Sequence, residues 1–197
     1  SMVLLQKDDN FAIHLQDNGT TDNYGHLRFT ISGSDGSVNY ITSSLQPFYN
    51  DEFWSVMLTR KSASNGVEFD DDSIYASSSF ELTTKYYEQS RQKILFQDSQ
   101  SMEITSSAIN AAFTSSGHIY LGGSGSSFGT QFSGSLMEYR LWSEPLSSSI
   151  FDNHVRVPKA YNGNHFSSSY DKLAVRYQLD ENKDFSDATK STASNTA

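Results

Sequence analysis

Residues 68–72 (EFDDD) carry the side chains best suited to chemistry in this chain. Alternate side chains of an extended strand share one face, so Glu68, Asp70 and Asp72 would line up together there. A retaining glycoside hydrolase needs two carboxyl groups about 5 Å apart on either side of the glycosidic bond. The surrounding stretch, residues 62–72, is polar and more typical of an exposed acidic loop. We therefore expect a non-enzyme without catalytic residues, with glycoside hydrolysis as the weaker alternative.

Three carboxylates are candidate ligands for a metal ion, namely those of Asp70, Asp72 and Asp51. Calcium prefers roughly six to eight oxygen ligands from carboxylates, carbonyls and water, and acidic loops supply them. The sequence has no loop of the EF-hand pattern, so any site would be assembled from separate segments. Calcium is the one cofactor that these residues indicate.

A second kind of chemistry is the stacking of a sugar on an aromatic ring. Tyr24 and Tyr49 are the best candidates, because polar turn residues flank both of them. Asp35 joins them as a candidate hydrogen-bonding ligand in a turn. For any single tyrosine, packing in the core is the simpler interpretation, and Trp54 and Trp142 are expected in the core.

Several classes of site and partner are excluded by composition and spacing. The formal net charge is −9 and there are no cysteines, which argues against nucleic acid and anionic membranes as partners and removes thiol chemistry. No apolar run reaches the roughly 18 residues of a membrane-spanning helix, so membrane insertion is not expected. Histidines with the spacing of a zinc site are missing, and so are a phosphate-binding loop and a nucleophile elbow.

Alternation of apolar and polar residues predicts that short strands position these side chains. We expect strands at residues 3–5, 11–15, 26–32, 38–42, 53–60, 79–88, 93–97, 119–121, 132–142 and 173–179. One helix is predicted, with Ser147 as its N-cap, Ile150, Phe151 and Val155 facing inward, and Pro158 at its end. His154 is expected near the C-terminus of that helix, where the helix dipole favours it.

The predicted organisation is a β-sandwich over residues 3–157, a linker over 158–172, an extra strand within 173–185 and a disordered tail over 186–197. Residues 173–179 (LAVRYQL) allow two interpretations. They begin the next module of a longer protein, which we favour, or they fold back and complete this sandwich.

Two motifs carry a resemblance to a known superfamily. Residues 118–154 contain, in order, Gly122-Gly123, Phe132-x-Gly134-x-Leu136, Arg140-Leu141-Trp142, Leu146-Ser147 and Ile150; residues 51–59 contain Trp54, Val56, Leu58 and Thr59 at matching spacing. This pattern resembles laminin-G-like modules of the concanavalin A-like lectin and glucanase superfamily. The resemblance implies an all-β, antiparallel jelly-roll sandwich with one short C-terminal helix.

The resemblance also implies a function. Modules of this superfamily serve mainly in binding and display, and they often hold a calcium ion at the rim of the sandwich. Its glucanases carry their acids on one strand as E-x-D-x-E, whereas the third acid here is the shorter Asp72. We expect a non-catalytic structural or binding module that recognises surface glycans or packs against neighbouring structural modules. A calcium-dependent lectin-like domain is the first alternative.

A final resemblance concerns the location of the protein. Residues 152–173, which contain Asp152-Asn153-His154-Val155, Pro158-Lys159 and Tyr161-x-Gly163-Asn164, look like repeated modules in large virion structural proteins of tailed bacteriophages. This likeness implies a place in a virion tail or fibre, or on an extracellular surface, as part of a larger multidomain chain.

Overall fold

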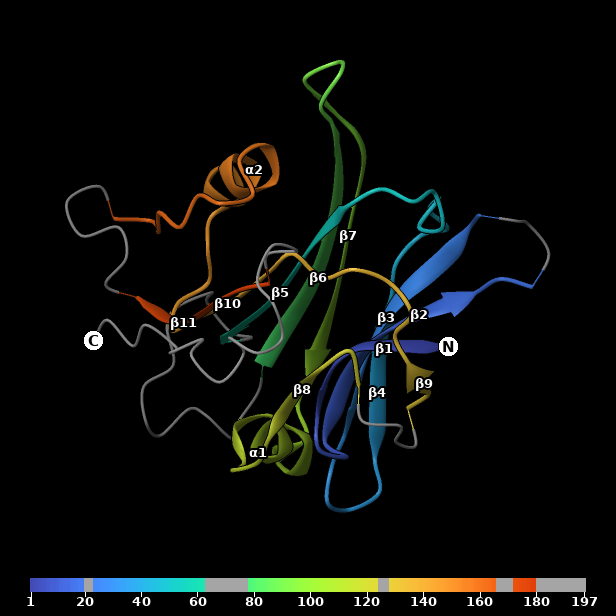
Figure 1. The fold of residues 1–197 in the computed structure, drawn as a ribbon. Helices are drawn as coiled ribbons and strands as arrows, with labels where there is room; N and C mark the ends of the chain where they lie inside the picture. Colours follow the sequence, from blue (N-terminus) through green and yellow to red (C-terminus); the bar gives the residue numbers. More distant parts are fainter. Residues whose placement is uncertain (20–22, 63–77, 124–127, 166–171, 180–197) are drawn as a thin grey trace, which may run out of the picture. The chain divides into compact units, whose positions relative to one another are not determined.

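The computed structural model describes residues 1–19, 23–62, 78–123, 128–165 and 172–179 of the 197-residue chain. These residues form mostly antiparallel β-sheet, as the sequence predicts. The chain folds into two compact units, residues 1–133 and residues 134–197, which are described separately below (Figure 1). The boundary between these units falls inside the predicted sandwich of residues 3–157, whose limits stay a prediction.

The first sheet of the first unit has six strands. Along the sheet their order is β4, β3, β2, β1 and β8, all antiparallel, and β9 pairs with β1 in parallel. The strands are β1 (Met2–Lys7), β2 (Phe11–Asp17), β3 (Gly25–Ser32), β4 (Val38–Thr42), β8 (Ile119–Leu121) and β9 (Thr130–Gln131).

The second sheet of this unit has three antiparallel strands in the order β5, β6, β7. They are β5 (Trp54–Ser62), β6 (Ser78–Glu88) and β7 (Lys93–Ile104). A tight turn joins β6 to β7 at one end of the unit, and α1 (Ser107–Thr114) lies at the opposite end (Figure 1).

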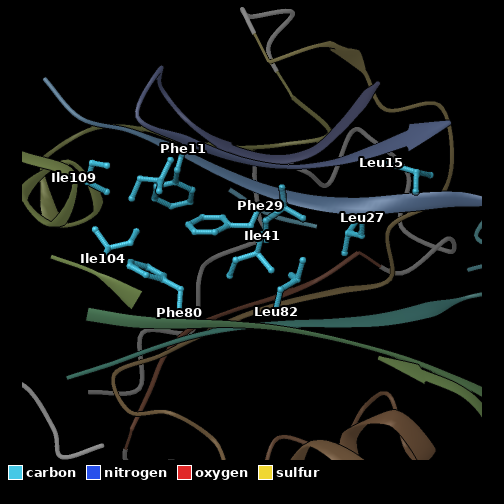
Figure 2. Close-up of a cluster of buried hydrophobic side chains, with 11 residues drawn as sticks. Phe11, Leu15, Leu27, Phe29, Ile41, Phe80, Leu82, Ile104 and Ile109 are labelled. Atoms are coloured by element: carbon cyan, nitrogen blue, oxygen red, sulfur yellow. The ribbon is translucent and has the colours of Figure 1, made fainter. Parts of the chain in front are cut away.

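One hydrophobic core is shared by the two sheets. Strict alternation in β3 buries Leu27, Phe29 and Ile31 and leaves the residues between them partly exposed. Figure 2 shows Phe29 and Ile41 pointing toward Phe80 and Leu82 of the second sheet. The rings of Phe29 and Phe80 stack with centroids 5.4 Å apart, so the two sheets are held together mainly by apolar burial.

The prediction of a single helix is wrong, because α1 is a second one. Its N-cap is Ser106, whose hydroxyl accepts a hydrogen bond from the backbone N–H of Ile109. Ile109 and Ala112 are buried against the core. With only eight residues and serines on both sides, this segment resembles a loop in the sequence, and packing rather than propensity stabilises it.

The second unit contains β10 (Glu138–Trp142), α2 (Ser148–Arg156) and β11 (Leu173–Gln178). Helix α2 agrees with the prediction, because the hydroxyl of its N-cap Ser147 accepts from the N–H of Ile150, and Phe151, His154 and Val155 are buried. Strand β11 pairs antiparallel with β10. The segment predicted as the start of another module thus joins a strand that precedes α2.

The remaining predicted strands agree with the structure apart from two. The prediction of one continuous strand over residues 132–142 is wrong, because residues 132–137 are not in a strand and separate β9 from β10. Gly134 lies in this gap and has no side chain to pack on a pleated surface. Strand β7 also extends beyond residue 97 to Ile104, because its polar half pairs with β6 along its whole length.

Candidate functional site

Tyr24 and Tyr49 are brought to the same end of the first unit. The backbone N–H of Tyr49 donates to the carbonyl of Asn23 over 3.1 Å, and Gly25 and Gln46 exchange two backbone hydrogen bonds of 2.9 and 3.0 Å. Tyr24 is 36% exposed, whereas Tyr49 is half-buried and packs against the core. The two predicted stacking residues are therefore neighbours, but only Tyr24 presents much of its surface to solvent.

The ring of Tyr49 is fixed by close packing. A Cβ atom at Gly25 would lie 2.9 Å from this ring and 2.6 Å from the carbonyl oxygen of Gln16, so only glycine fits there. Burial, followed by the negative charge of Asp17, raises the pKa of the Tyr49 hydroxyl. These contacts give Tyr49 a packing role in addition to its predicted one.

Asp35 lies far from the two tyrosines. It sits in the turn between β3 and β4, where its Oδ1 accepts hydrogen bonds from the backbone N–H of Ser37, over 3.0 Å, and from the Ser37 hydroxyl. These bonds lower the pKa of the Asp35 carboxyl. Tyr24 precedes the first residue of β3 and Asp35 follows its last, so about 25 Å of strand separates them. The predicted trio is not assembled in one place.

The candidate calcium ligands are only partly placed. Asp51 is exposed and has a left-handed backbone, with φ of 57°. Asp70 and Asp72 lie outside the described residues, as does Glu68. Among the residues that the structure describes, no group of three or more histidine and carboxylate side chains is arranged to hold a metal ion.

The most prominent site feature of the first unit is a group of four aromatic rings, here called the aromatic cluster: Phe48, Trp54, Tyr86 and Phe96. Ring centroids lie 4.5 Å apart for Phe48 and Trp54, 5.5 Å for Trp54 and Tyr86, 6.0 Å for Trp54 and Phe96, and 6.3 Å for Tyr86 and Phe96. Each ring packs against at least one of the others, so they form a connected, packed group rather than a cage with room inside.

Strand register places three of these rings side by side. Trp54 is opposite Tyr86 in the pairing of β5 with β6, and Tyr86 is opposite Phe96 in the pairing of β6 with β7. Side chains of directly opposite residues lie on the same face of a sheet. Phe80 and Leu82 also lie on this face, so the cluster continues the core toward the turn that joins β6 to β7.

The turn at residues 50–52 holds the tryptophan in place. The side-chain oxygen Oδ1 of Asn50 accepts one hydrogen bond from the indole Nε1–H of Trp54 and a second from the backbone N–H of Glu52, each 3.2 Å long. The left-handed residue Asp51 closes the turn between them. The indole of Trp54 and the backbone of the turn are therefore fixed relative to one another.

Part of the cluster is open to solvent. Phe96 is 37% exposed, whereas Tyr86 is buried, and Phe53, the residue before Trp54 in the sequence, is 47% exposed. Leu45, in the segment after β4, and Val56, on β5, are further exposed apolar residues of this unit.

Carboxylates border the cluster. Asp51 and Glu52 are exposed, and Glu88 forms an ion pair of 3.3 Å with Arg91 beyond the end of β6. The pKa of the Tyr86 hydroxyl is raised first by burial and then by the negative charges of Glu52 and Glu88. The charges of Glu52 and Glu88 therefore act on the hydroxyl of Tyr86.

Sequence reasoning placed Trp54 in the core and did not single out Phe48 or Phe96. Trp54 is in fact half-buried, with its ring at the edge of the apolar interior. The available signal was the sequence N-D-E-F-W at residues 50–54, where a polar turn precedes two aromatic residues. Strand register was needed to see that Tyr86 and Phe96 lie beside that tryptophan.

The second unit has a polar site of its own. Glu138 bridges Arg140, over 3.2 Å, and Arg176, over 2.9 Å, and Arg176 lies over the ring of Tyr161 at 4.8 Å. Arg140 also donates to the carbonyl of Pro158. These contacts attach part of the predicted linker, residues 158–172, to the β10–β11 pair.

His154 occupies the predicted place in the last turn of α2. It stacks on Trp142 with centroids 5.9 Å apart, and its Nε2 is 2.8 Å from the carbonyl oxygen of Asn162. Burial lowers its pKa, so packing and this hydrogen bond hold the imidazole more than charge at the helix end does.

Comparisons with protein-family models, with curated proteins and with solved structures find no match for this chain. None of the helices in the described residues is both long and apolar enough to span a membrane.

Proposed function

We propose that this chain is a non-catalytic binding module that recognises glycans through the aromatic cluster. The observation that carries the proposal is the packed group of Phe48, Trp54, Tyr86 and Phe96, in which Phe96 is exposed and Phe48 and Trp54 are half-buried. The C–H face of a pyranose ring is apolar, and it stacks on an aromatic face of this kind, whereas the sugar hydroxyls need polar partners at the border.

The structure around the cluster supports recognition by a preformed surface. Asn50 fixes the indole of Trp54, and the pairing of β5, β6 and β7 fixes the other rings. A binding surface that is already ordered loses little conformational freedom when a ligand arrives, which favours affinity. The exposed carboxylate of Asp51 is a polar group at this border.

We place the module among jelly-roll sandwiches of the concanavalin A and laminin-G type, supported by two antiparallel sheets that share one core. We also propose that it is part of a larger structural protein, in a virion or on an extracellular surface. That part rests on sequence resemblance alone.

Calcium enters the proposal as a ligand that orients sugar hydroxyls. Asp51 is its one predicted ligand among the described residues, and it lies on the turn that holds Trp54. A bound cation at this turn would attract the hydroxyl oxygens of a stacked sugar. Removal of calcium is therefore expected to weaken glycan binding.

A glycan array tests the proposal directly. The purified chain is applied in calcium and again in a chelator, alongside the variant Phe96→Ala. Tyr40→Ala is the matched control, since Tyr40 is 59% exposed and lies on β4 of the other sheet. We expect binding to one class of sugar that is lost in Phe96→Ala and kept in Tyr40→Ala. Absence of binding to any glycan would overturn the proposal.

A structural role is the second candidate function. The exposed apolar residues Leu45, Phe53 and Val56 favour it, because such side chains also suit the surface of a neighbouring module. Analytical ultracentrifugation of the chain mixed with the adjoining segments of its parent protein distinguishes the two. Association that is abolished by Phe53→Ala, in a chain that binds no glycan, would favour the structural role.

A further inference from the structure

Resting on the proposed function, we infer that the aromatic cluster selects uncharged glycans and discriminates against glycans that carry carboxylate or sulfate groups. Four carboxylates lie around the aromatic cluster, namely those of Asp51, Glu52, Glu88 and Asp98.

Two of these carboxylates, those of Asp51 and Glu52, lie on the turn that is hydrogen-bonded to Trp54. Asn50 Oδ1 bonds both the Trp54 indole and the backbone of Glu52, so the turn that carries Asp51 and Glu52 cannot move away from the ring without breaking these bonds. Both carboxylates are exposed. A sugar stacked on Trp54 therefore lies beside a turn that carries two negative charges.

The other two carboxylates lie on the strands. Asp98 is two residues along β7 from Phe96, on the same face, roughly 7 Å away along the strand. Its Oδ2 accepts a hydrogen bond of 2.8 Å from the backbone N–H of Ser44, which fixes its position. Glu88 lies beyond Tyr86 at the end of β6. Negative charge therefore lies near the rings both on the turn before β5 and on strands β6 and β7.

Three basic residues lie near the four carboxylates and do not cancel their charge: Arg91, Lys93, and Lys85, which precedes Tyr86 and lies on the opposite face of β6. Arg91 is paired with Glu88 over 3.3 Å, and Lys93 is exposed at the start of β7. The chain as a whole carries a formal charge of −9. A glycan carboxylate or sulfate at this surface therefore approaches an excess of like charge and is repelled.

The test compares three forms of one sugar. A neutral glycan that binds the chain on the array is oxidised at C6 to the uronic acid, and a portion of that acid is converted to its methyl ester. Oxidation adds a charge with little change of shape, and esterification removes the charge again. Affinities are measured by calorimetry in chelator, so that no calcium ion neutralises Asp51, at low salt and at about 1 M salt, where charges are screened within roughly 3 Å.

We expect the acid to bind about five- to tenfold more weakly than the neutral glycan at low salt. The ester is expected to regain most of that affinity, and about 1 M salt is expected to narrow the gap between acid and neutral glycan. Equal affinity of acid and neutral glycan at low salt would overturn the inference and leave the proposed function in place. Absence of binding by every neutral glycan would overturn both.

Variants that remove one charge test whether the carboxylates near the aromatic cluster weaken binding of the uronic acid. Glu52→Gln keeps the shape of the side chain and removes its charge, so it should improve binding of the uronic acid several-fold and leave the neutral glycan unchanged. Glu103→Gln is the matched control, because Glu103 is exposed and lies near the far end of β7. An equal improvement in both variants would show that overall charge, rather than the border of the cluster, decides the preference, and would contradict the inference.

Discussion

The side-chain oxygen of Asn50 lies 3.2 Å from the indole nitrogen of Trp54 and accepts its hydrogen bond. The same oxygen also accepts from the backbone of Glu52. One amide therefore fixes both the largest ring of the aromatic cluster and the carboxylates at its border. The order of this surface depends on a turn that precedes β5 rather than on the strand itself.

Asn50→Ala removes both hydrogen bonds of this turn. Each is worth about 0.5–1.5 kcal/mol net, so we expect a loss of about 1–2 kcal/mol in the free energy of unfolding. Glycan affinity should fall as well, because the indole is no longer held. Urea denaturation and calorimetry measure the two effects. Unchanged glycan affinity in a folded Asn50→Ala variant would show that the turn does not organise the binding surface.

Phe80→Ala tests the core between the two sheets of the first unit. Phe80 is fully buried and packs on Phe29 and Phe113, with ring centroids 5.4 and 5.1 Å away. Truncation of such a ring costs about 3–5 kcal/mol. Phe96→Ala, at the exposed end of the same face, should cost less than half as much. Similar losses in the two variants, measured by urea denaturation, would argue against a core centred on Phe80.

Because His14 is buried, the free energy of unfolding should depend on pH. It is 5% exposed, its Nε2 is 2.9 Å from the Thr30 hydroxyl and its Nδ1 has no hydrogen-bond partner. Burial, with the positive charges of Arg28 and the N-terminus, lowers its pKa to about 4. In the unfolded chain the histidine takes up a proton near pH 6.5, whereas in the folded chain it does so only near pH 4. The free energy of unfolding therefore decreases by about 3 kcal/mol as the pH falls from about 6.5 to about 4.

The variant His14→Gln removes this titration, so its unfolding free energy should depend less on pH between 6.5 and 4 than that of the wild type. Urea denaturation at several pH values measures it. His118→Gln, an exposed histidine of the same unit, is the matched control and should retain the wild-type dependence. Identical pH profiles for wild type and His14→Gln would contradict the role given to His14.

Lys7 connects β1 to the end of α1. Its ammonium donates to the carbonyl of Phe113, over 2.9 Å, and to that of Ser115. Burial lowers its pKa despite the opposing charge of Asp8. Lys7→Met removes two charge-assisted bonds from the helix end, so we expect a loss of about 1–3 kcal/mol.

Hydrogen exchange measures this effect locally, and the amides of α1 should exchange faster in Lys7→Met. The matched control is Lys61→Met, since Lys61 makes an exposed ion pair of 3.7 Å with Glu81. Surface pairs of this kind contribute little, about 0–1 kcal/mol. Equal protection of α1 in wild type and Lys7→Met would show that the lysine does not hold the helix.

Most strands of the fold could be predicted from the sequence, because alternation survives wherever one face of a strand is buried. Residues 26–32 show this, with Leu27, Phe29 and Ile31 buried as expected. The start of α2 could also be predicted from the sequence, because N-capping depends only on neighbouring residues. The Ser147 hydroxyl accepts a hydrogen bond from the N–H of Ile150, three residues later.

The misses have a common physical cause, which is dependence on distant contacts. Helix α1 is too short for propensity to stabilise, and it exists because Ile109 packs into a core made by other strands. The polar half of β7 has no apolar alternation of its own, and pairing with β6 extends it to Ile104.

The candidate site was the least predictable part for the same reason. The structure brings Tyr24 and Tyr49 close together, whereas Asp35 lies at the other end of β3. Trp54, Tyr86 and Phe96 are separated by up to 42 positions in sequence and become neighbours only through strand register. Composition and local spacing carry no information on register.

The central claim is that sugars stack on the aromatic cluster, and the fluorescence of Trp54 tests it most directly. The chain has two tryptophans, so Trp142→Phe leaves Trp54 as the only reporter. We predict that a neutral glycan selected on the array produces a saturable change in Trp54 emission, with the affinity measured by calorimetry, and that Phe96→Ala abolishes it. Glycan binding without any change in Trp54 emission would contradict the claim.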